Sequence, residues 1–307
     1  MRRKNLLSLK DWSGPEIIET IDFAQRLKED RKQGIDNKLL KGKYLGMIFA
    51  KSSTRTRISF EVGMKELGGD AIFLSSDDIQ LGRGESISDT AKVLSRYLDG
   101  IMIRTFKQKD VVKLAKYASI PVINGLTDKF HPCQILADFQ TISELKGSLN
   151  GLKLAYVGDG NNVANTLLYG CAKVGMDIAV AAPEGYECDT KIVAVANAYA
   201  RESGSKVMIT KDPAEAVTDA DVVYTDTWVS MGQESEKEKK IKAFEGYQVN
   251  KALVSHARKD YIFLHCLPAY RGYEVSDEII DGSHSKVFDE AENRLHVQKA
   301  VMVKLMK

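Results

Sequence analysis

The amino-acid sequence predicts an α/β fold with two domains, each a mostly parallel β-sheet flanked by helices, with a C-terminal helix packing back on the first domain. Short apolar, β-branched runs alternate with longer segments of helical periodicity, which is typical of βαβ units. A chain of 307 residues is also long enough for two domains of about 150 residues each. Hydrophobic residues make up 44% and aromatic residues 8%, as in ordinary globular domains.

The strands and domain limits follow from these patterns. Apolar residues at helical spacing over residues 134–146 predict a helix, and the GSLNG that follows breaks the chain. We therefore expect a first domain over residues 1–147, joined by a C-terminal helix over residues 290–307, and a second domain over residues 151–288. Six apolar runs are the expected strands: residues 44–49, 99–103, 153–158, 177–182, 221–225 and 261–265.

Charge and cysteine usage exclude several classes of protein. Lys and Arg number 44 against 42 Asp and Glu, so the surface as a whole is not built to bind nucleic acid or an acidic membrane. No apolar run approaches the length of a membrane span, and Asp11 arrives too early for a signal peptide. The four cysteines show no CxxC spacing, which favours a reducing cytoplasm. The charged run over residues 234–242 predicts a solvated helix face.

Polar clusters follow several of the predicted strands. Ligands of open α/β sheets bind beyond the carboxyl ends of the strands, so these clusters predict one site that faces both domains. The clusters are residues 53–57, Arg104, GDGNN at 158–162, DTWVSMG at 226–232 and CLP at 266–268.

The first cluster, SSTRTR, predicts a phosphate site. If a helix begins near Thr54, its first turn has unpaired N–H groups and a dipole that favours an anion. Hydroxyls at Ser53, Thr54 and Thr56 add donors, and Arg55 adds a planar fork suited to phosphate. The alternative is simple capping by Ser52 or Ser53, with the arginines paired to surface acids. Arg57 is expected to pair with Glu61.

The GDGNN cluster resembles an incomplete dinucleotide-binding turn. Gly158 and Gly160 fit the pattern, but Val163 stands where the third glycine belongs. Asn161 and Asn162 instead offer amides at a helix start, where a carboxylate binds well.

Two further motifs carry reactive side chains. His131 precedes Pro132, which suits the first position of a helix, and with Gln134 it could polarise a carbonyl and accept from an amino group. Cys266 could be a nucleophile, a proton relay or a small buried residue, and adjacent His265 should face the opposite way on a strand. HxC and HC lack zinc-site spacing, so no metal is expected.

Together these motifs resemble the aspartate/ornithine carbamoyltransferase family over nearly the whole chain. SSTRTR, Arg104, HPCQ from His131, GDGNN, DTWVSMG, HCLP and ENR ending at Arg294 occur in the family's order. SMG and HCLP are typical of the ornithine branch, whereas the aspartate branch is expected to carry HPLPR and a lysine near residues 80–86 that is absent here. Tyr270 departs from the His of many relatives, without putting a core role in doubt.

The resemblance implies a carbamoyl-phosphate site and a homotrimer, alone or in an assembly of trimers. In relatives the equivalent of Gln80 reaches a neighbouring subunit's site. No metal or organic cofactor is implied, because the leaving group is already activated. The implied carbamoyl-phosphate residues are Ser53, Thr54, Arg55, Thr56, Gln80, Arg104, His131, Gln134, Cys266, Leu267 and Arg294.

The resemblance also implies L-ornithine as the acceptor, with L-citrulline and phosphate as products of a cytoplasmic, arginine-making or arginine-degrading metabolism. The implied ornithine residues are Asn162, Asp226, Ser230 and Met231, with Asn165 as a further carboxylate ligand. The implied catalytic residues are Arg55, Arg104, His131, Asp226 and Cys266.

Two other classes of function stay open from the sequence. An NAD-dependent dehydrogenase would use the GDGNN turn for pyrophosphate, and a noncatalytic binding protein would use the same pocket without turnover. Within the family, putrescine, acetylornithine and aspartate are alternative acceptors. The motif DTWVSMG favours an acceptor with a free α-amino acid head.

Overall fold

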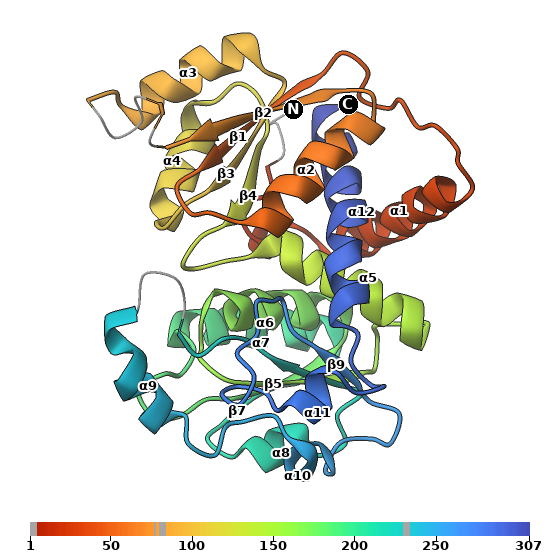
Figure 1. Ribbon diagram of the computed structural model, residues 1–307, viewed down its shortest axis with the longest axis vertical. Coiled ribbons are helices and arrows are strands. Elements are labelled where there is room, and N and C mark those ends of the chain that lie inside the picture. Colours follow the sequence, from red (N-terminus) through yellow and green to blue (C-terminus); the bar gives the residue numbers. More distant parts are fainter. Residues whose placement is uncertain (1–4, 77, 80–83, 230–233) are drawn as a thin grey trace. The chain divides into compact units, whose positions relative to one another are not determined.

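The computed structural model describes residues 5–76, 78–79, 84–229 and 234–307, which form two compact units (Figure 1). Unit 1 comprises Met1–Gln140 and Glu292–Lys307, and unit 2 comprises Thr141–Ala291. Helices α5 (Pro132–Lys146) and α12 (Val287–Met306) each carry the chain from one unit to the other. The chain therefore passes between the two units within two helices.

Unit 1 contains a parallel four-stranded sheet in the order β2-β1-β3-β4. Its strands are β1 (Tyr44–Phe49), β2 (Asp70–Ser75), β3 (Gly100–Arg104) and β4 (Val122–Leu126). The last residue of β1, Phe49, lies opposite Arg104 on one side and Ser75 on the other. Because the strands run the same way, the residues after β1 and β3 gather at one edge of the sheet.

Helices cover both faces of this sheet. Figure 1 shows α3 and α4 on one side and α1, α2 and the unit 1 portion of α12 on the other. Ser53 is the N-cap residue of α2. Its hydroxyl accepts a hydrogen bond from the backbone N–H of Thr56, as expected of a capping serine. The remaining elements of unit 1 are η1 (Leu9–Asp11), α1 (Gly14–Lys32), α2 (Thr54–Glu66), α3 (Ile87–Tyr97) and α4 (Gln108–Tyr117).

Unit 2 contains a parallel five-stranded sheet in the order β7-β6-β5-β8-β9. Its strands are β5 (Lys153–Val157), β6 (Asp177–Ala181), β7 (Val207–Thr210), β8 (Val222–Thr225) and β9 (Ile262–Leu264). Tyr224 lies opposite Leu264, so the segments that follow β8 and β9 leave the sheet side by side. The sheet thereby places Asp226 beside Cys266.

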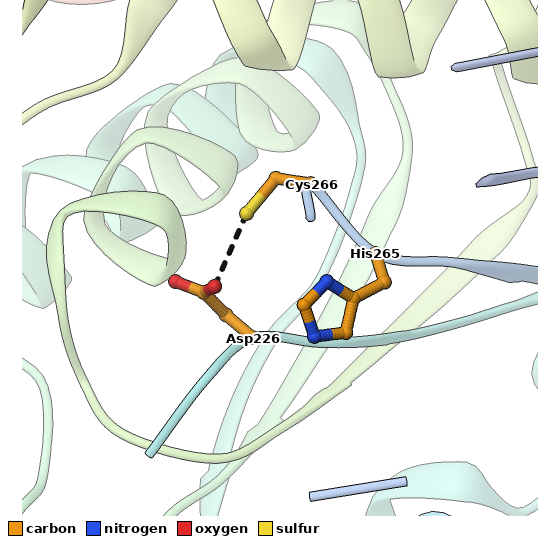
Figure 2. Close-up of side chains that lie close together, drawn as sticks. All are labelled: Asp226, His265 and Cys266. Atoms are coloured by element: carbon orange, nitrogen blue, oxygen red, sulfur yellow. Dashed lines mark hydrogen bonds between the residues drawn. The ribbon is translucent and has the colours of Figure 1, made fainter. Parts of the chain in front are cut away.

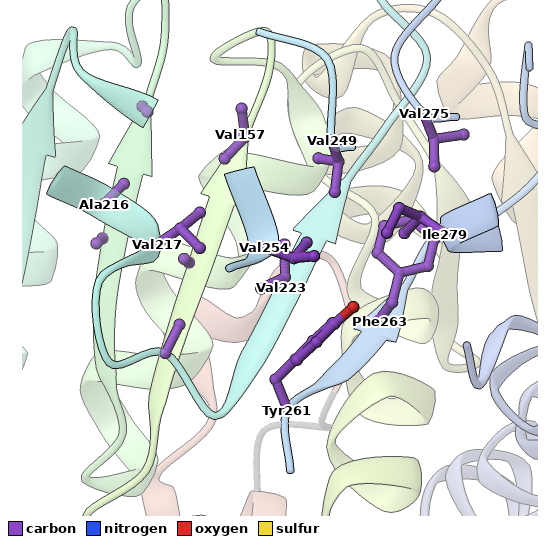
Figure 3. Packing of buried hydrophobic residues seen from close by; sticks show 14 of the residues in the cluster. Val157, Ala216, Val217, Val223, Val249, Val254, Tyr261, Phe263, Val275 and Ile279 are labelled. Atoms are coloured by element: carbon purple, nitrogen blue, oxygen red, sulfur yellow. The ribbon is translucent and has the colours of Figure 1, made fainter. Parts of the chain in front are cut away.

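The helices of unit 2 lie on both faces of its sheet, with α6 and α7 on one and α8, α10 and α11 on the other (Figure 1). Figure 3 shows the core on the second face, where Val223 and Phe263 of the sheet pack with Val217, Val254 and Ile279 of those short helices. The helices are α6 (Asn162–Val174), α7 (Thr190–Ser203), α8 (Pro213–Val217), η2 (Glu234–Glu236), α9 (Lys237–Ala243), α10 (Lys251–Val254) and α11 (Asp277–Ile280).

The predicted fold class is confirmed: both units are parallel sheets flanked by helices, and the chain ends in a long helix. The expected charged helix is also present, but one of its residues departs from a solvated face. Lys240 is 2% exposed, and its ammonium lies 2.5 Å from the carboxylate of Asp159. Among the described residues, no helix is long and apolar enough to cross a membrane.

Candidate active site

The hydroxyl of Thr56 is the centre of a polar cluster at the sheet edge of unit 1. It lies 3.0 Å from the hydroxyl of Ser53, 3.5 Å from Nη1 of Arg104 and 3.3 Å from Nη2 of Arg294. Three parts of the sequence meet here, because α2, β3 and α12 each contribute one side chain or more. The helix N-terminus and both guanidinium groups therefore present donors to the same place, which is the chemistry of an anion site.

Both arginines of this cluster are buried, Arg104 at 5% and Arg294 at 3% exposure. Arg294 Nη1 donates to Oε1 of Gln134 at 2.6 Å, and Gln134 Nε2 donates to Asp138 at 2.9 Å. These bonds fix the guanidinium plane and the amide. Burying positive charge is costly, so an anion bound beside the two arginines would be strongly stabilised.

His131 lies in the same unit, immediately before α5, which begins at Pro132 as predicted. The imidazole is 5% exposed. Burial is the main reason why the pKa of His131 lies well below its usual value. The positive charges of Arg294, Arg104 and Arg55 lower this pKa further. The ring is therefore neutral at physiological pH and can donate a hydrogen bond without carrying a charge.

The two arginines of STRTR have different surroundings. Arg57 Nε lies 3.6 Å from Glu61, and its guanidinium lies 3.9 Å above the ring of Phe73. The predicted pairing of Arg57 with Glu61 is thus confirmed, and this arginine is held on the helix surface. Arg55 is half-buried and contributes its charge to the environment of His131.

Lys51, two residues before Ser53 in the chain, is a buried cation that no sequence motif singled out. Its side chain is 7% exposed, and its ammonium donates to Asp128 at 2.6 Å and lies 4.3 Å above the ring of Phe106. Its partners come from loops far along the chain, so no local pattern identifies it.

Unit 2 pairs Asp226 with Cys266 beyond the ends of β8 and β9. Figure 2 shows the two side chains pointing toward each other, with the thiol donating to Asp226 Oδ1 at 3.1 Å. Asp226 also accepts from Nδ2 of Asn161 at 2.7 Å and from the backbone N–H of Thr227 at 2.8 Å. The carboxylate is 6% exposed, and these donors satisfy its buried oxygens.

Asn161 is the residue of GDGNN that builds the site in this structure. Its Oδ1 accepts from the N–H groups of Val163 and Ala164 and so caps α6, while its Nδ2 holds Asp226. Asn162 is the first residue of α6 and is half-buried, and Asn165 is buried one turn further on. The sequence pointed to this pair of asparagines but could not assign the capping role, since either could cap a helix.

The glycines of this turn have a packing explanation. A Cβ at Gly160 would lie 2.4 Å from the backbone nitrogen of Cys188, so only glycine fits against the chain that passes there. Gly158 has a φ of +152°, in the region that L side chains rarely adopt. The GxG pattern is therefore accounted for without a pyrophosphate, which weakens the dinucleotide alternative.

One cluster of metal-ligand types occurs in this region of the described chain. Ligand atoms of Asp226, His265 and Cys266 lie within 4.8 Å of one another. However, both ring nitrogens of His265 are engaged, Nδ1 by the N–H of Leu267 at 2.9 Å and Nε2 by Glu274 at 3.2 Å. A metal would have to break these bonds, so the arrangement is better suited to hydrogen bonding than to metal binding.

Most of the predicted site residues that are described fall into these two clusters, one in each unit. Unit 1 brings together Ser53, Thr56, Arg104, Gln134 and Arg294, with His131 among the same arginines. Unit 2 brings together Asp226 and Cys266, with Leu267 next in the chain. Three predicted residues lie outside the described part of the chain: Gln80, Ser230 and Met231.

Comparison with known proteins identifies the family. The model of the aspartate/ornithine carbamoyltransferase carbamoyl-P binding domain matches residues 4–144, and the model of the Asp/Orn binding domain of the same family matches residues 150–305. The chain belongs to the aspartate/ornithine carbamoyltransferase family. The order of the two family domains along the chain agrees with the polar cluster around Thr56 lying in unit 1 and the Asp226–Cys266 pair in unit 2.

Individual relatives match over almost their whole length. An ornithine carbamoyltransferase from Caldicellulosiruptor saccharolyticus is 63% identical over 300 residues, covering 98% of this chain and 97% of the relative. That of Bacillus subtilis is 60% identical over 299 residues, covering 97% and 92%. The solved structure of ornithine carbamoyltransferase from Pyrococcus furiosus is 55% identical, with a TM-score of 0.96, covering 99% of this chain and 97% of that one.

Proposed function

We propose that this protein transfers the carbamoyl group of carbamoyl phosphate to the side-chain amine of L-ornithine, giving L-citrulline and phosphate. The observation that carries the proposal is the buried Asp226, which is held by three donors and faces the thiol of Cys266. A fixed carboxylate beside a thiol suits an acceptor that has an ammonium group to bind and an amine to orient. Full-length relatives named ornithine carbamoyltransferase support the same reaction.

Carbamoyl phosphate would bind to unit 1. The first turn of α2 and Arg55 would hold its phosphate, because helix N–H groups and a guanidinium fork are suited to an oxyanion. Gln134, held in place by Arg294 and Asp138, would bind the carbamoyl NH2 with the backbone carbonyls of Cys266 and Leu267. Further phosphate contacts are assigned to Ser53, Thr54, Thr56 and Arg104, with Gln80 supplied by a neighbouring subunit.

The carbonyl oxygen would face Thr56, Arg104 and His131. Negative charge develops on this oxygen when an amine attacks, and donors fixed in advance stabilise that charge without reorganising. The lowered pKa of His131 keeps its ring neutral, so it serves as a donor rather than as a proton source. Buried Arg104 supplies the positive charge.

Ornithine would bind to unit 2. Its α-ammonium would pair with Asp226, and its α-carboxylate would meet Asn162 and Asn165 at the start of α6, where the helix dipole favours an anion. Ser230 and Met231 are assigned to the same end of the amino acid. Acetylornithine lacks the free α-ammonium and putrescine lacks the carboxylate, so both would bind less well.

The chemical step needs a neutral amine, because an ammonium has no lone pair. Cys266 would orient the side-chain amine. The proton that leaves the ammonium goes either to the thiolate form of Cys266 or to the departing phosphate, because a thiol that still carries its own proton cannot accept another. The amine nitrogen then forms a bond to the carbonyl carbon, and the tetrahedral intermediate collapses by breaking the bond to the phosphate oxygen. The attacking nitrogen loses a second proton after the C–N bond has formed. Of the two protons, one ends on the departing phosphate and the other passes to solvent.

A homo-oligomer with shared sites is also proposed, formed along the edge strand β2. Ile72 and Phe73 of this strand are 45% and 38% exposed, and Ile58 of α2 is 54% exposed. Natural proteins seldom leave an apolar edge strand open to water. The chain leads from β2 to Gln80 within a few residues, so an interface here would bring Gln80 close to a partner subunit.

Light scattering during size-exclusion chromatography tests this interface. The wild type is expected to elute as a trimer or a multiple of it, and Ile72→Lys to shift toward the monomer with lower activity. Val112→Lys, on the exposed face of α4 at 49% exposure, is the matched control and should leave the mass unchanged. A monomeric, fully active wild type would refute the shared site.

A cytoplasmic location is proposed on the basis of the cysteines. All four are unbridged, and three of them are buried, which fits a reducing compartment.

Phosphate release from carbamoyl phosphate separates an enzyme from a binding protein. Release above the spontaneous rate should require added L-ornithine and should fall sharply in Asp226→Asn, which keeps the shape but not the charge. Release that is independent of any amine would contradict the proposed transfer.

A further inference from the structure

We propose that the buried pair His265 and Glu274 is the device that positions the turn at Cys266–Leu267 for catalysis. The proposal rests on the function proposed above, in which this turn presents the Cys266 thiol and the Leu267 carbonyl to the substrates. His265 and Glu274 are 0% and 1% exposed, so water does not compete for their hydrogen bonds. Both act through the turn and are positioning residues.

The hydrogen bonds of His265 fix its tautomer. The backbone N–H of Leu267 lies 2.9 Å from Nδ1, and since an N–H can only donate, Nδ1 accepts and carries no proton. The ring proton therefore sits on Nε2, 3.2 Å from Oε1 of Glu274, which accepts it. One carboxylate thus orients the imidazole, and the imidazole in turn holds the backbone of Leu267.

The turn needs such support because of its backbone conformation. Leu267 has a φ of +55°, in the left-handed region that a bulky side chain adopts only when its surroundings impose it. The hydrogen bond from His265 reaches the N–H of this same residue. Its loss would let the peptide relax and would turn the neighbouring thiol and carbonyl away from their present directions.

Buried carboxylates hold the turn at both ends. Glu290 accepts from the backbone N–H of His265 at 2.9 Å and from the hydroxyl of Tyr224 at 3.1 Å. Glu274 accepts from the backbone N–H of Tyr270 at 2.5 Å as well as from the imidazole. Buried acids are costly in a protein interior, so two of them around one turn indicate a constraint on its geometry rather than a gain in stability.

A pair of variants separates positioning from simple core packing. His265→Asn keeps an acceptor near the place of Nδ1 and loses the reach to Glu274, whereas His265→Gln reaches toward Glu274 and loses the acceptor for Leu267. His284→Asn is the matched control, because His284 is a partly buried histidine of the same unit that bonds to the backbone carbonyl of Tyr261 at 2.7 Å.

Two readouts are measured on folded protein. The first is kcat with ornithine beside KM for carbamoyl phosphate. The second is the rate at which iodoacetamide modifies Cys266 in the unliganded protein, followed by peptide mass. Cys133, Cys171 and Cys188 are buried, so the half-buried Cys266 is the thiol that the reagent reaches.

His265→Gln is expected to lower kcat by about tenfold or more, since small misplacements of reacting groups are costly, while KM for carbamoyl phosphate changes little. The same variant should alter the Cys266 modification rate severalfold, and His265→Asn should lie closer to the wild type in both. Equal behaviour of the two variants, or kcat and modification rates like those of His284→Asn, would overturn the positioning role.

A second pair covers the case in which His265→Gln does not fold. Glu274→Gln retains an oxygen that accepts from the imidazole, and Glu274→Met has similar length without an acceptor. Only Glu274→Met should change kcat and Cys266 modification, and a wild-type response from it would overturn the proposal. If the wild type carbamoylates no amine but the modification rates differ as expected, the positioning role stands and the proposed function falls.

Discussion

At the scale of single residues, two arginines two positions apart have different surroundings. Arg57 is occupied by Glu61 and by the ring of Phe73, whereas Arg55 stands among the charges that act on His131. Their chemistry is identical, so the difference comes only from which side of α2 each occupies. This makes Arg57 a matched control for any test of Arg55.

Arg55→Ala is expected to weaken carbamoyl-phosphate binding while the protein stays folded. Hydrogen bonds to a charged group contribute about 1.5–3 kcal/mol, so the dissociation constant should rise roughly 10- to 150-fold. Calorimetric titration with carbamoyl phosphate measures this change. Arg57→Ala should bind the ligand like the wild type, and an Arg55→Ala protein that did so would refute the assignment.

Cys266→Ala is expected to lower turnover more than it lowers affinity for carbamoyl phosphate. The thiol faces Asp226 in unit 2, whereas the polar cluster around Thr56, the proposed site of carbamoyl phosphate, lies in unit 1. We expect kcat to fall on the order of tenfold to a hundredfold, as for the loss of a group that orients a reactant. Steady-state kinetics with both substrates varied provides the measurement, with buried Cys171→Ala as control. Unchanged turnover would remove the thiol from the mechanism.

At the scale of elements, two neighbouring asparagines at the N-terminus of α6 have different positions and contacts. Asn161 caps the helix and holds Asp226, while Asn162 occupies the first helical position. Asn161 therefore supports the structure, whereas Asn162 is the asparagine that we propose as a ligand for ornithine.

Replacing each asparagine by alanine should separate these effects. Asn161→Ala loses a cap and should lower the free energy of unfolding by about 0.5–2 kcal/mol, in addition to lowering turnover through Asp226. Asn162→Ala should leave stability nearly unchanged and raise KM for ornithine. Chemical denaturation and steady-state kinetics measure the two effects. The reverse pattern would show that the capping assignment is wrong.

Some features of these elements could be predicted from the sequence, and others could not. The cap at Ser53, the start of α5 at Pro132 and the Arg57–Glu61 pair are local, so they were predictable from neighbouring residues. The ion pair between Lys240 and Asp159 joins two residues that are far apart in the chain. No periodicity of the sequence predicts such a pair.

Three strands were also not among the predicted apolar runs. Strands β2 and β7 lie at sheet edges and are partly exposed, and β4 is interrupted by Asn124 and Gly125. Their identity as strands depends on pairing with neighbours, which only the assembled sheet provides.

At the scale of the whole molecule, two buried histidines link stability to pH. Burial, followed by nearby positive charge, lowers the pKa of His131 well below 6.5 and that of His296 to about 3. Well above pH 6.5, the usual pKa of histidine, both are neutral in the folded and unfolded states. Below that pH the two histidines bind protons in the unfolded chain but stay neutral in the folded protein. The free energy of unfolding therefore falls as the pH decreases.

Each histidine should lower the free energy of unfolding by about 1.4 kcal/mol for each unit by which the pH falls in this range. For His296 the range runs from about pH 6.5 to 3. His296→Leu should make the decline between pH 6.5 and 5 less steep, without loss of stability at pH 8. Thermal midpoints measured across this range check the slope. An equally steep decline in the variant would contradict the link.

Carbamoyl phosphate and L-ornithine are the substrates that we propose for this protein. A colorimetric assay for ureido products, run with carbamoyl phosphate and each of ornithine, aspartate, putrescine and acetylornithine, tests it most directly. We expect citrulline from ornithine and at most trace product from the other three amines. A preference for any other acceptor, or no ureido product from ornithine, would contradict it.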